Sequence, residues 1–253
     1  MRVFLTGASS GIGEALARHY AAQGATLGLF ARRPDALARL ASALAPATVA
    51  TWAGDVRDAG ALARAGAEFI ARFGVPDVVI ANAGVSRGAL TDEPGDLAVI
   101  REVVETNVLG IVHTFAPFVA AMRAARAGTL VGIASVAGFR GLPGSGAYSA
   151  SKAAAIAYLE SLRVELVGSG VAVVTVCPGF VATPMTARNP YPMPFLLPPD
   201  RAAALIARAV ARRRRFYVLP WPMAWIGRLL RVAPRSLYDR VLAGRKRKPR
   251  DAG

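Results

Sequence analysis

Short apolar segments alternate with amphipathic segments along most of the chain, and this alternation limits the fold more than any other feature. We expect strands at Arg2–Thr6, Ala25–Ala31, Thr48–Trp52, Asp77–Ala81, Gly128–Ala134, Val171–Cys177 and Phe216–Leu219. Helices are expected between them, including Pro34–Leu44, Asp58–Phe73, Leu97–Ala125 and Gly146–Val167. Such alternation is typical of a parallel sheet covered by helices, and strands buried on both faces are apolar throughout. The pattern predicts an α/β fold, a single doubly wound Rossmann-type domain with a mainly parallel sheet and helices on both faces.

Glycines and polar residues collect where the expected strands end. In doubly wound sheets, ligands bind beyond the carboxyl ends of the strands. The residues at or just past those ends are Gly7, Arg32, Asp55, Asn82, Ser135 and Pro178. We therefore expect the functional site along this edge of the sheet.

The segment Thr6–Gly13 is a glycine-rich turn between the first strand and the first helix. Its spacing, Gly-x-x-x-Gly-x-Gly, allows a tight turn and a close approach of a ligand to the backbone. The helix N-terminus that follows presents free N–H groups and a positive dipole end to a pyrophosphate. With its flanking strands, the turn favours a dinucleotide cofactor. The alternative is a turn that only packs the helix on the sheet.

The end of the second strand discriminates between nicotinamide cofactors. A unit that binds NAD usually has an acidic residue there, which binds the ribose hydroxyls. This chain has Ala31, Arg32 and Arg33 instead. Two guanidinium groups without a carboxylate favour the 2′-phosphate of NADP(H), with NAD(H) as a second possibility. In the other interpretation, both arginines are solvated at the start of the helix that opens at Pro34.

Tyr148 and Lys152 are four residues apart in an alanine-rich segment that is expected to be helical. This spacing puts the phenol and the ammonium on one face of the helix. A cation beside a phenol favours the phenolate and lowers the phenol pKa, which suits a general acid or base at a carbonyl. The alternative is a packed ring beside a solvated charge.

At this point the sequence resembles the short-chain dehydrogenase/reductase family over about residues 1–210. The motifs that carry the resemblance are Thr6–Gly13, Asn82–Gly84, Asn107, Ser135, Tyr148 with Lys152, and Pro178 with Gly179. They occur in the family's order and spacing, and their joint occurrence makes the resemblance specific.

The resemblance implies a cofactor that lies along the strand ends. Its pyrophosphate is expected at the glycine-rich turn, its adenine near Asp55 and Val56, and its carboxamide near Thr183. The full set expected to bind the cofactor is Gly7, Ser9, Ser10, Gly11, Ile12, Gly13, Arg32, Arg33, Asp55, Val56, Asn82, Ala83, Gly84, Tyr148, Lys152, Pro178, Gly179, Val181 and Thr183.

The resemblance also implies catalytic roles for Asn107, Ser135, Tyr148 and Lys152. Tyr148 is expected to be the acid/base, and Ser135 to hold the substrate oxygen. Lys152 is expected to bind the nicotinamide ribose and lower the Tyr148 pKa, and Asn107 to support a water that links Lys152 to solvent.

The chemistry of carbonyl reduction agrees with these roles. Hydride addition to a carbonyl carbon leaves charge on oxygen, which a hydrogen-bond donor and an acid stabilise. We expect an NADPH-preferring oxidoreductase that interconverts a ketone or aldehyde and an alcohol. The alternative is a non-catalytic NADP(H)-binding sensor or scaffold. No metal site is expected.

Length and composition are consistent with one catalytic domain and a short extension. The chain has 253 residues, 54% of them hydrophobic, which suffices for a large core. We expect a catalytic domain over 1–219 and an extension over 220–253.

The lone cysteine, Cys177, is expected in the core and fits a reducing compartment. Since neither a signal peptide nor a membrane span is expected, the predicted location is cytoplasmic, with peripheral contact to the inner face of a membrane as a variant.

Residues 183–200 are rich in proline and apolar side chains and are expected to cover the substrate. Five large side chains suggest an apolar or lipid-like substrate, namely Met185, Tyr191, Met193, Phe195 and Leu196. The alternative is a segment that packs on its own body.

The C-terminal part of the chain carries most of the net charge of +15. Between Arg212 and Arg250 there are 13 Lys or Arg residues and one acid, Asp239. Two helical stripes lie in this region, Met223/Ile226/Leu229/Leu230 and Leu237/Tyr238/Val241/Leu242. A basic amphipathic segment of this kind binds anionic membranes, docks on the body or a partner subunit, or is simply solvated. A homo-oligomer is expected, and nucleic acid is not, because no recognition motif accompanies the charge.

Overall fold

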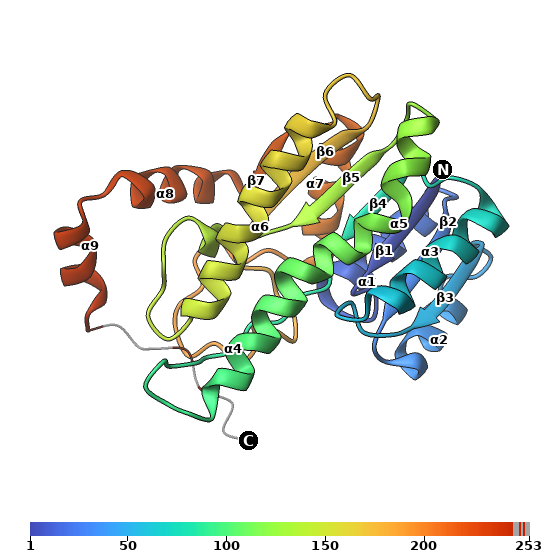
Figure 1. Cartoon of the computed structure of the whole chain (residues 1–253). Coiled ribbons are helices and arrows are strands. Elements are labelled where there is room, and N and C mark those ends of the chain that lie inside the picture. Colours follow the sequence, from blue (N-terminus) through green and yellow to red (C-terminus); the bar gives the residue numbers. More distant parts are fainter. Residues whose placement is uncertain (245–247, 249, 251–253) are drawn as a thin grey trace.

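The computed structural model describes residues 1–244, 248 and 250, and it contains a seven-stranded sheet (Figure 1). The strands are β1 (Arg2–Thr6), β2 (Thr26–Ala31), β3 (Val49–Ala53), β4 (Val78–Ala81), β5 (Thr129–Ile133), β6 (Ala172–Pro178) and β7 (Phe216–Leu219). Their order is β3-β2-β1-β4-β5-β6-β7, and all neighbouring strands are parallel. This confirms the predicted doubly wound α/β fold. The direction of winding reverses between β1 and β4, and such a switch point is where these folds bind ligands.

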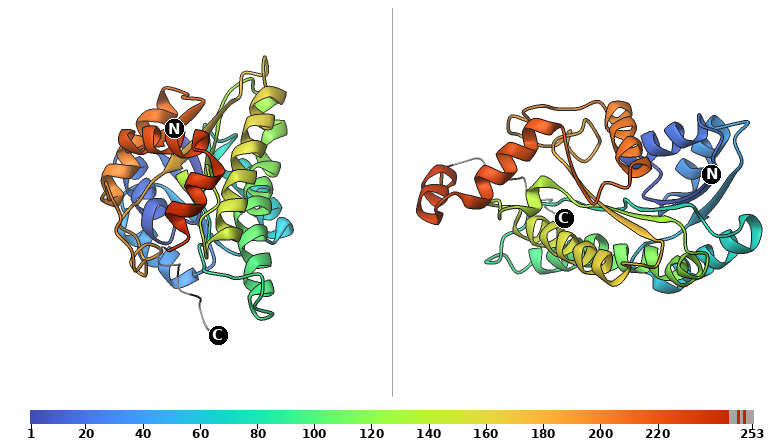
Figure 2. Two further views of the ribbon diagram at one scale, coloured as in Figure 1. Left: turned by 90° about the vertical axis from the view of Figure 1, so that its left-hand side faces the viewer. Right: turned by 90° about the horizontal axis from the view of Figure 1, so that it is seen from above.

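Helices cover both faces of the sheet, as Figure 2 shows in the view from above. The helices are α1 (Gly11–Ala21), α2 (Pro34–Ala43), α3 (Ala59–Phe73), α4 (Asp96–Val104), α5 (Gly110–Ala124), α6 (Gly146–Glu165), α7 (Pro199–Ala211), α8 (Trp221–Val232) and α9 (Arg235–Leu242). The buried clusters place α1, α2 and α7 on one face of the sheet, and α3, α5 and α6 on the other.

Two hydrophobic cores result, one on each face of the sheet, and β1 contributes to both. Successive side chains of a strand point to opposite faces. Leu5 therefore belongs to the core under α1 and α7, while Phe4 packs in the other core with Phe69 and Phe118 at ring-centroid distances of 5.6 and 4.8 Å. This explains why the strands read as continuous apolar runs.

The helix expected over Leu97–Ala125 is present, but it contains a π-helical turn at Glu105–Leu109 between α4 and α5. The wider turn carries Asn107, which is fully buried. By length and composition alone, the stretch Asp96–Ala124 could cross a membrane. Its apolar residues Phe115, Phe118 and Met122 are buried in the core beside the sheet, and this packing accounts for its apolar character.

The C-terminal helices extend from the β7 edge of the sheet (Figure 1). Helix α8 docks on the body, because Arg140 donates hydrogen bonds from Nη1 to the carbonyls of Leu230 and Ala233. Tyr238 of α9 donates its hydroxyl proton to the Gly141 carbonyl at 2.5 Å. These contacts agree with the docking alternative for residues 220–244. The rest of the expected extension lies outside the described residues, apart from Lys248 and Arg250.

Candidate active site

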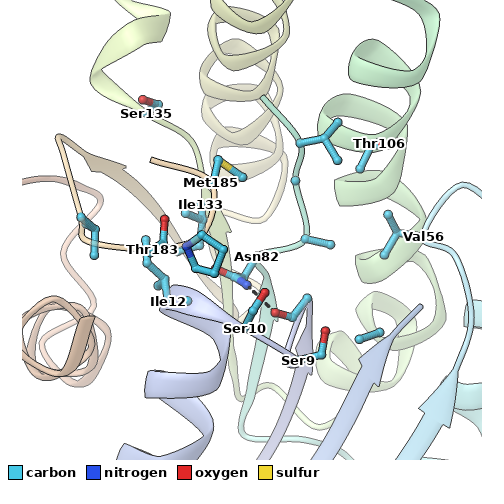
Figure 3. A pocket seen from close by; sticks show the side chains of 18 of the residues that line it. Ser9, Ser10, Ile12, Val56, Asn82, Thr106, Ile133, Ser135, Thr183 and Met185 are labelled. Carbon is cyan, nitrogen blue, oxygen red and sulfur yellow. Dashed lines mark hydrogen bonds between the residues drawn. The ribbon is translucent and has the colours of Figure 1, made fainter. Parts of the chain in front are cut away.

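A cavity of about 690 Å³ follows the carboxyl ends of the strands, as expected from the sequence. In Figure 3, Ser9 and Ser10 lie at one end of this pocket, and Ser135 lies at the other. Every residue expected to bind the cofactor lines it except Gly13, and of the four expected catalytic residues only Asn107 lies outside its lining. We call it the cofactor cavity.

The glycine-rich turn is shaped by two glycines that no other residue can replace. Gly7 has φ +69°, and a Cβ at Gly13 would collide with the Gly7 carbonyl oxygen. Asn82 fastens the turn from β4, because its Nδ2 donates to the carbonyls of Thr6 and Gly7 at 3.1 and 3.2 Å. The Ser10 side chain makes no capping hydrogen bond with α1. The turn thus leaves the N-terminus of α1 facing the cavity.

Arg32 and Arg33 both line the cofactor cavity after β2. Arg33 Nη2 donates to the Ser9 carbonyl at 3.0 Å and to Ser9 Oγ at 3.2 Å, which holds the guanidinium at the glycine-rich turn. Arg32 forms a longer ion pair with Glu102, with 3.7 Å between Nη1 and Oε1. The nearby carboxylate of Asp55 is paired with Arg57 at 2.8 Å, and this side-chain hydrogen bond lowers the Asp55 pKa.

Thr106 was not expected at the site, yet it lines the cofactor cavity next to Val56 (Figure 3). Its hydroxyl is buried and has no hydrogen-bond partner among the residues that the structure describes. A buried orphan hydroxyl is costly unless a ligand satisfies it. The cavity volume, the glycine turn and this hydroxyl together fit a dinucleotide.

Ser135 and Tyr148 meet at the far end of the cofactor cavity. The Ser135 hydroxyl oxygen accepts from the Ala137 N–H at 3.1 Å, which fixes its position after β5. Burial raises the pKa of the Tyr148 phenol, and its hydrogen bond with Ser135 acts in the opposite direction. The expected lowering of this pKa is therefore wrong for the structure as it stands, because desolvation is the largest influence. The phenol is neutral at pH 7, the protonation state that an acid requires.

Lys152 lies one helical turn from Tyr148 and is buried in the same wall. Its Nζ donates to the Ile133 carbonyl at 2.8 Å and lies 5.8 Å from the Tyr148 ring centroid. Burial lowers the Lys152 pKa to about 8. The shared face predicted from the spacing of four residues is thus present, with the ammonium oriented by a strand carbonyl.

Asn107 lies behind this pair, and the backbone satisfies most of its side chain. Its Oδ1 accepts from the Val85 N–H at 2.8 Å, and its Nδ2 donates to the Val85 carbonyl at 2.9 Å and to Ser151 Oγ at 3.0 Å. These bonds hold the loop after β4 against α6. The role expected for Asn107, support of a water beside Lys152, stays a prediction.

A second cavity of about 680 Å³ shares Ser135, Tyr148, Gly179, Met185 and Thr186 with the first. Its remaining lining comes from the loops after β4 and β5, the segment after β6, α8 and the chain beyond it. These residues are Ser86, Val136, Ala137, Arg140, Leu142, Pro143, Ser145, Phe180, Asn189, Pro190, Tyr191, Pro192, Pro194, Met223, Ile226, Gly227, Leu230, Leu242 and Lys248. We call it the substrate cavity, since it opens onto the hydroxyls expected to hold the reacting oxygen.

Two residues of the segment 183–200, Met185 and Thr186, line both cavities, and its covering role stays a prediction. Near the start of the segment, Thr186 donates a hydrogen bond from Oγ1 to the Val181 carbonyl at 2.6 Å. Of the large side chains expected to contact substrate, Met185 and Tyr191 line the substrate cavity. Phe195 and Leu196 are instead exposed, and neither they nor Met193 belong to the lining of this cavity.

Comparison with known proteins agrees with this geometry. The family model described as short chain dehydrogenase matches residues 1–192. The chain belongs to the short-chain dehydrogenase/reductase family. An uncharacterized oxidoreductase of Myxococcus xanthus is 38% identical to this short-chain dehydrogenase over 237 residues, covering 93% of each protein.

Two further relatives of this short-chain dehydrogenase carry more specific names. The 11-beta-hydroxysteroid dehydrogenase A of Arachis hypogaea is 38% identical over 187 residues, covering 73% of this chain and 53% of that protein. An alcohol dehydrogenase from Thermococcus sibiricus, solved in complex with 5-hydroxy-NADP, has 30% identity and a TM-score of 0.76, with 86% of this chain and 94% of that one covered. The family places this chain among the NAD(P)-dependent oxidoreductases.

Several residues of the short-chain dehydrogenase site were not among those expected to bind the cofactor. The cofactor cavity also contains Ala31, Gly54, Val85, Thr106, Ile133, Ala134, Pro184, Met185 and Thr186. Most of these are neighbours of residues that were expected, so their positions follow from the strand ends. Thr106 belongs to the long helix, and the sequence did not indicate the π-helical turn that contains it. Within the described residues, no cluster of His, Cys, Asp and Glu is arranged to hold a metal ion.

Proposed function

We propose that this protein is an NADPH-preferring reductase of ketones or aldehydes, or the corresponding alcohol dehydrogenase, with an apolar substrate. The observation that carries the proposal is the meeting of two cavities at Ser135 and Tyr148. One cavity, of about 690 Å³, has room for a dinucleotide, and the other is lined mainly by apolar side chains. A hydroxyl pair at their junction is where the oxygen of a substrate would lie.

Three side chains of the protein would have separate roles in the reaction at the carbonyl oxygen. When bound, NADPH supplies the hydride equivalent that the carbonyl carbon receives. Ser135 would donate a hydrogen bond to the substrate oxygen, and Tyr148 would give that oxygen its proton. Lys152, oriented by the Ile133 carbonyl at 2.8 Å, would stabilise the resulting phenolate with its positive charge. The balance is carbonyl plus NADPH plus a proton to alcohol plus NADP⁺.

The preference for NADPH is supported by the arginines after β2. Arg33 is held at Ser9, and Arg32 lines the same end of the cofactor cavity. A 2′-phosphate there would accept charge-assisted hydrogen bonds from guanidinium groups. Since Asp55 is paired with Arg57, its carboxylate is partly neutralised and would not repel the phosphate.

An apolar substrate is supported by the lining of the substrate cavity. Phe180, Met223, Ile226 and Leu230 form its walls, with Tyr191 of the covering segment. Such a lining binds apolar ligands by removing them from water. The steroid dehydrogenase named above is a relative whose name indicates an apolar substrate.

Contact with an anionic membrane surface is a further part of the proposal. Helix α8 presents Trp221, Trp225, Leu229 and Val232 to solvent, each between 63% and 77% exposed. Arg228 lies 5.2 Å from the Trp225 ring centroid. Exposed tryptophan beside arginine is typical of an interfacial helix, so a peripheral location at the inner face of a membrane would suit a cytoplasmic enzyme with an apolar substrate.

A homo-oligomer also remains a prediction. Helices α4 and α6 expose Leu97 and Val164, which are 59% and 60% accessible. Light scattering on the purified protein measures the oligomeric state directly, and a monomer mass would contradict the prediction.

The test of the proposed function is turnover of purified protein with a panel of ketones and aldehydes, followed as loss of NADPH absorbance. We expect reduction, with lower KM for apolar substrates. Binding of NADPH without any turnover across the panel, in either direction of reaction, would favour the sensor or scaffold alternative.

A further inference from the structure

The end of the described chain returns to the body and is anchored there by Arg250. Its Nε donates to Asp96 Oδ2, and its Nη2 donates to Glu93 Oε2, both at 2.9 Å. Arg250 also forms a parallel β-bridge with Gly88. The Asp96 side chain is only 7% exposed and accepts the Leu90 N–H as well, so the ion pair is partly shielded from water.

This anchor brings Lys248 to the reacting groups. Lys248 lines the substrate cavity, and its Nζ donates to Ser86 Oγ at 2.5 Å. The same ammonium lies 5.9 Å from the Tyr148 ring centroid, nearly the distance of 5.8 Å found for Lys152. Lys152 belongs to the cofactor cavity, whereas Lys248 belongs to the substrate cavity. A second cation is thus placed beside the acid/base, on the side that the substrate would occupy.

The charges along the described part of the substrate cavity have one sign. Among the described residues of its lining, Lys248 and Arg140 are charged, and there is no Asp or Glu. Arg140 serves the structure of α8, because its guanidinium binds the Leu230 and Ala233 carbonyls and lies 4.2 Å from the Tyr238 ring centroid. Lys248 instead lies at the reacting end of the cavity. In apolar surroundings a cation attracts an anion more strongly than it does in water.

We infer that Lys248 binds a carboxylate of the substrate, and that the enzyme selects apolar carbonyl compounds with a carboxylate close to the carbonyl carbon. The inference rests on the proposed function and specifies its substrate class. Ser86 orients the ammonium, and Arg250 is a positioning residue that keeps Lys248 in the lining of the cavity. The apolar part of the substrate lies along Met223, Ile226 and Leu230, which line the same cavity.

The experiment compares an acid with its own ester on the full-length enzyme. The probes are 2-oxo-4-phenylbutanoate and its ethyl ester, assayed with NADPH for wild type, Lys248→Gln and Lys248→Glu. The matched control is Arg240→Gln, which removes one positive charge from an exposed position on α9 that does not line the cavity. A charge-assisted hydrogen bond corresponds to roughly ten- to hundredfold. We expect wild type and the control to prefer the acid by at least tenfold in kcat/KM. Lys248→Gln should lose that preference because its kcat/KM falls for the acid and stays the same for the ester.

Two further arms separate this inference from its alternatives. Arg250→Gln should lower the acid-to-ester ratio while leaving turnover of the ester within about twofold, a pattern that general loss of stability would not produce. Calorimetric titration of the NADP⁺-loaded protein with both probes gives the same comparison without turnover. There, Lys248→Gln should weaken binding of the acid at least tenfold and leave binding of the ester unchanged.

The results that would overturn the inference are distinct from those that would overturn the proposed function. Reduction of the ester by wild type with no preference for the acid would reject Lys248 as a carboxylate site and leave the reductase intact. An equal rise in both rates in Lys248→Gln would mean that the side chain only obstructs the cavity. If neither probe is reduced, equal calorimetric affinities of wild type and Lys248→Gln for the acid would reject the inference independently.

Discussion

Replacing Arg32 and Arg33 by alanine should convert a preference for NADPH into near indifference between NADPH and NADH. Both side chains line the cofactor cavity after β2, where a dinucleotide would place its adenosine ribose. The perturbation removes two cations and leaves Asp55, a carboxylate that lines the same cavity, paired with Arg57 at 2.8 Å. Cofactors that differ only in the 2′-phosphate therefore report on the arginines alone.

The size of the effect follows from the exposure of these arginines. A hydrogen bond to a charged group contributes about 1.5–3 kcal/mol. The Arg32 side chain is 55% exposed and forms an ion pair with Glu102 at 3.7 Å. Because solvent screens exposed charges, we expect Arg32 and Arg33 together to contribute only the lower end of this range of free energy. About 1.5 kcal/mol corresponds to roughly tenfold in the dissociation constant. The double variant should lose at least that factor for NADPH and less than about twofold for NADH.

The assay is titration of both cofactors by fluorescence or calorimetry at fixed ionic strength, with Arg39→Ala as the control. Arg39 is an exposed arginine on the neighbouring α2, so its loss removes one positive charge, as the loss of either arginine of the pair does, from a position that does not line the cavity. Equal losses for NADPH and NADH would refute the reasoning, because they would mean that the arginines support the fold of the turn and not the phosphate.

Two more predictions concern the buried lysine and the exposed face of α8. Burial lowers the Lys152 pKa from 10.5 to about 8, so between these pH values the unfolded chain binds one more proton than the folded chain. The free energy of unfolding of wild type, relative to that of Lys152→Met, should therefore rise with pH over this window, by up to about 3 kcal/mol. Denaturant titrations at pH 7.5 and 10.5 measure it, and a constant difference would place Lys152 in a more hydrated site. Full-length protein should co-sediment with anionic vesicles in a salt-sensitive way, and changing Trp225 and Leu229 to serine should release it without loss of turnover. Equal sedimentation with neutral and anionic vesicles would remove the membrane proposal.

Features that depend on neighbours in sequence were predictable. The strand–turn–helix unit around Gly7, the strand ends and the pairing of Tyr148 with Lys152 all follow from local spacing, and the structure contains them. Parallel strands bring their carboxyl ends to one edge, so residues from different strands could be assigned to one site without a contact map. The seventh strand, Phe216–Leu219, was also found from its apolar run.

Features that depend on long-range contacts were not predictable. The π-helical turn that buries Asn107 is stabilised by Val85 and Ser151, far away in the sequence. The sequence identified Lys248 and Arg250 only as members of a basic tail, because their partners Ser86 and Asp96 lie more than 150 residues earlier. The Tyr148 pKa depends on burial, which a spacing of four residues does not reveal.

The central claim is that Tyr148 transfers the proton at a carbonyl oxygen between the two cavities. Its most direct test is Tyr148→Phe, measured by single-turnover consumption of NADPH with a carbonyl substrate that wild type reduces. The substitution keeps the ring between the two cavities and removes only the hydroxyl, so NADPH should bind with an affinity within about threefold of wild type while the rate falls at least about a hundredfold. A variant that binds NADPH normally and reduces the substrate within a few-fold of the wild-type rate would contradict the account.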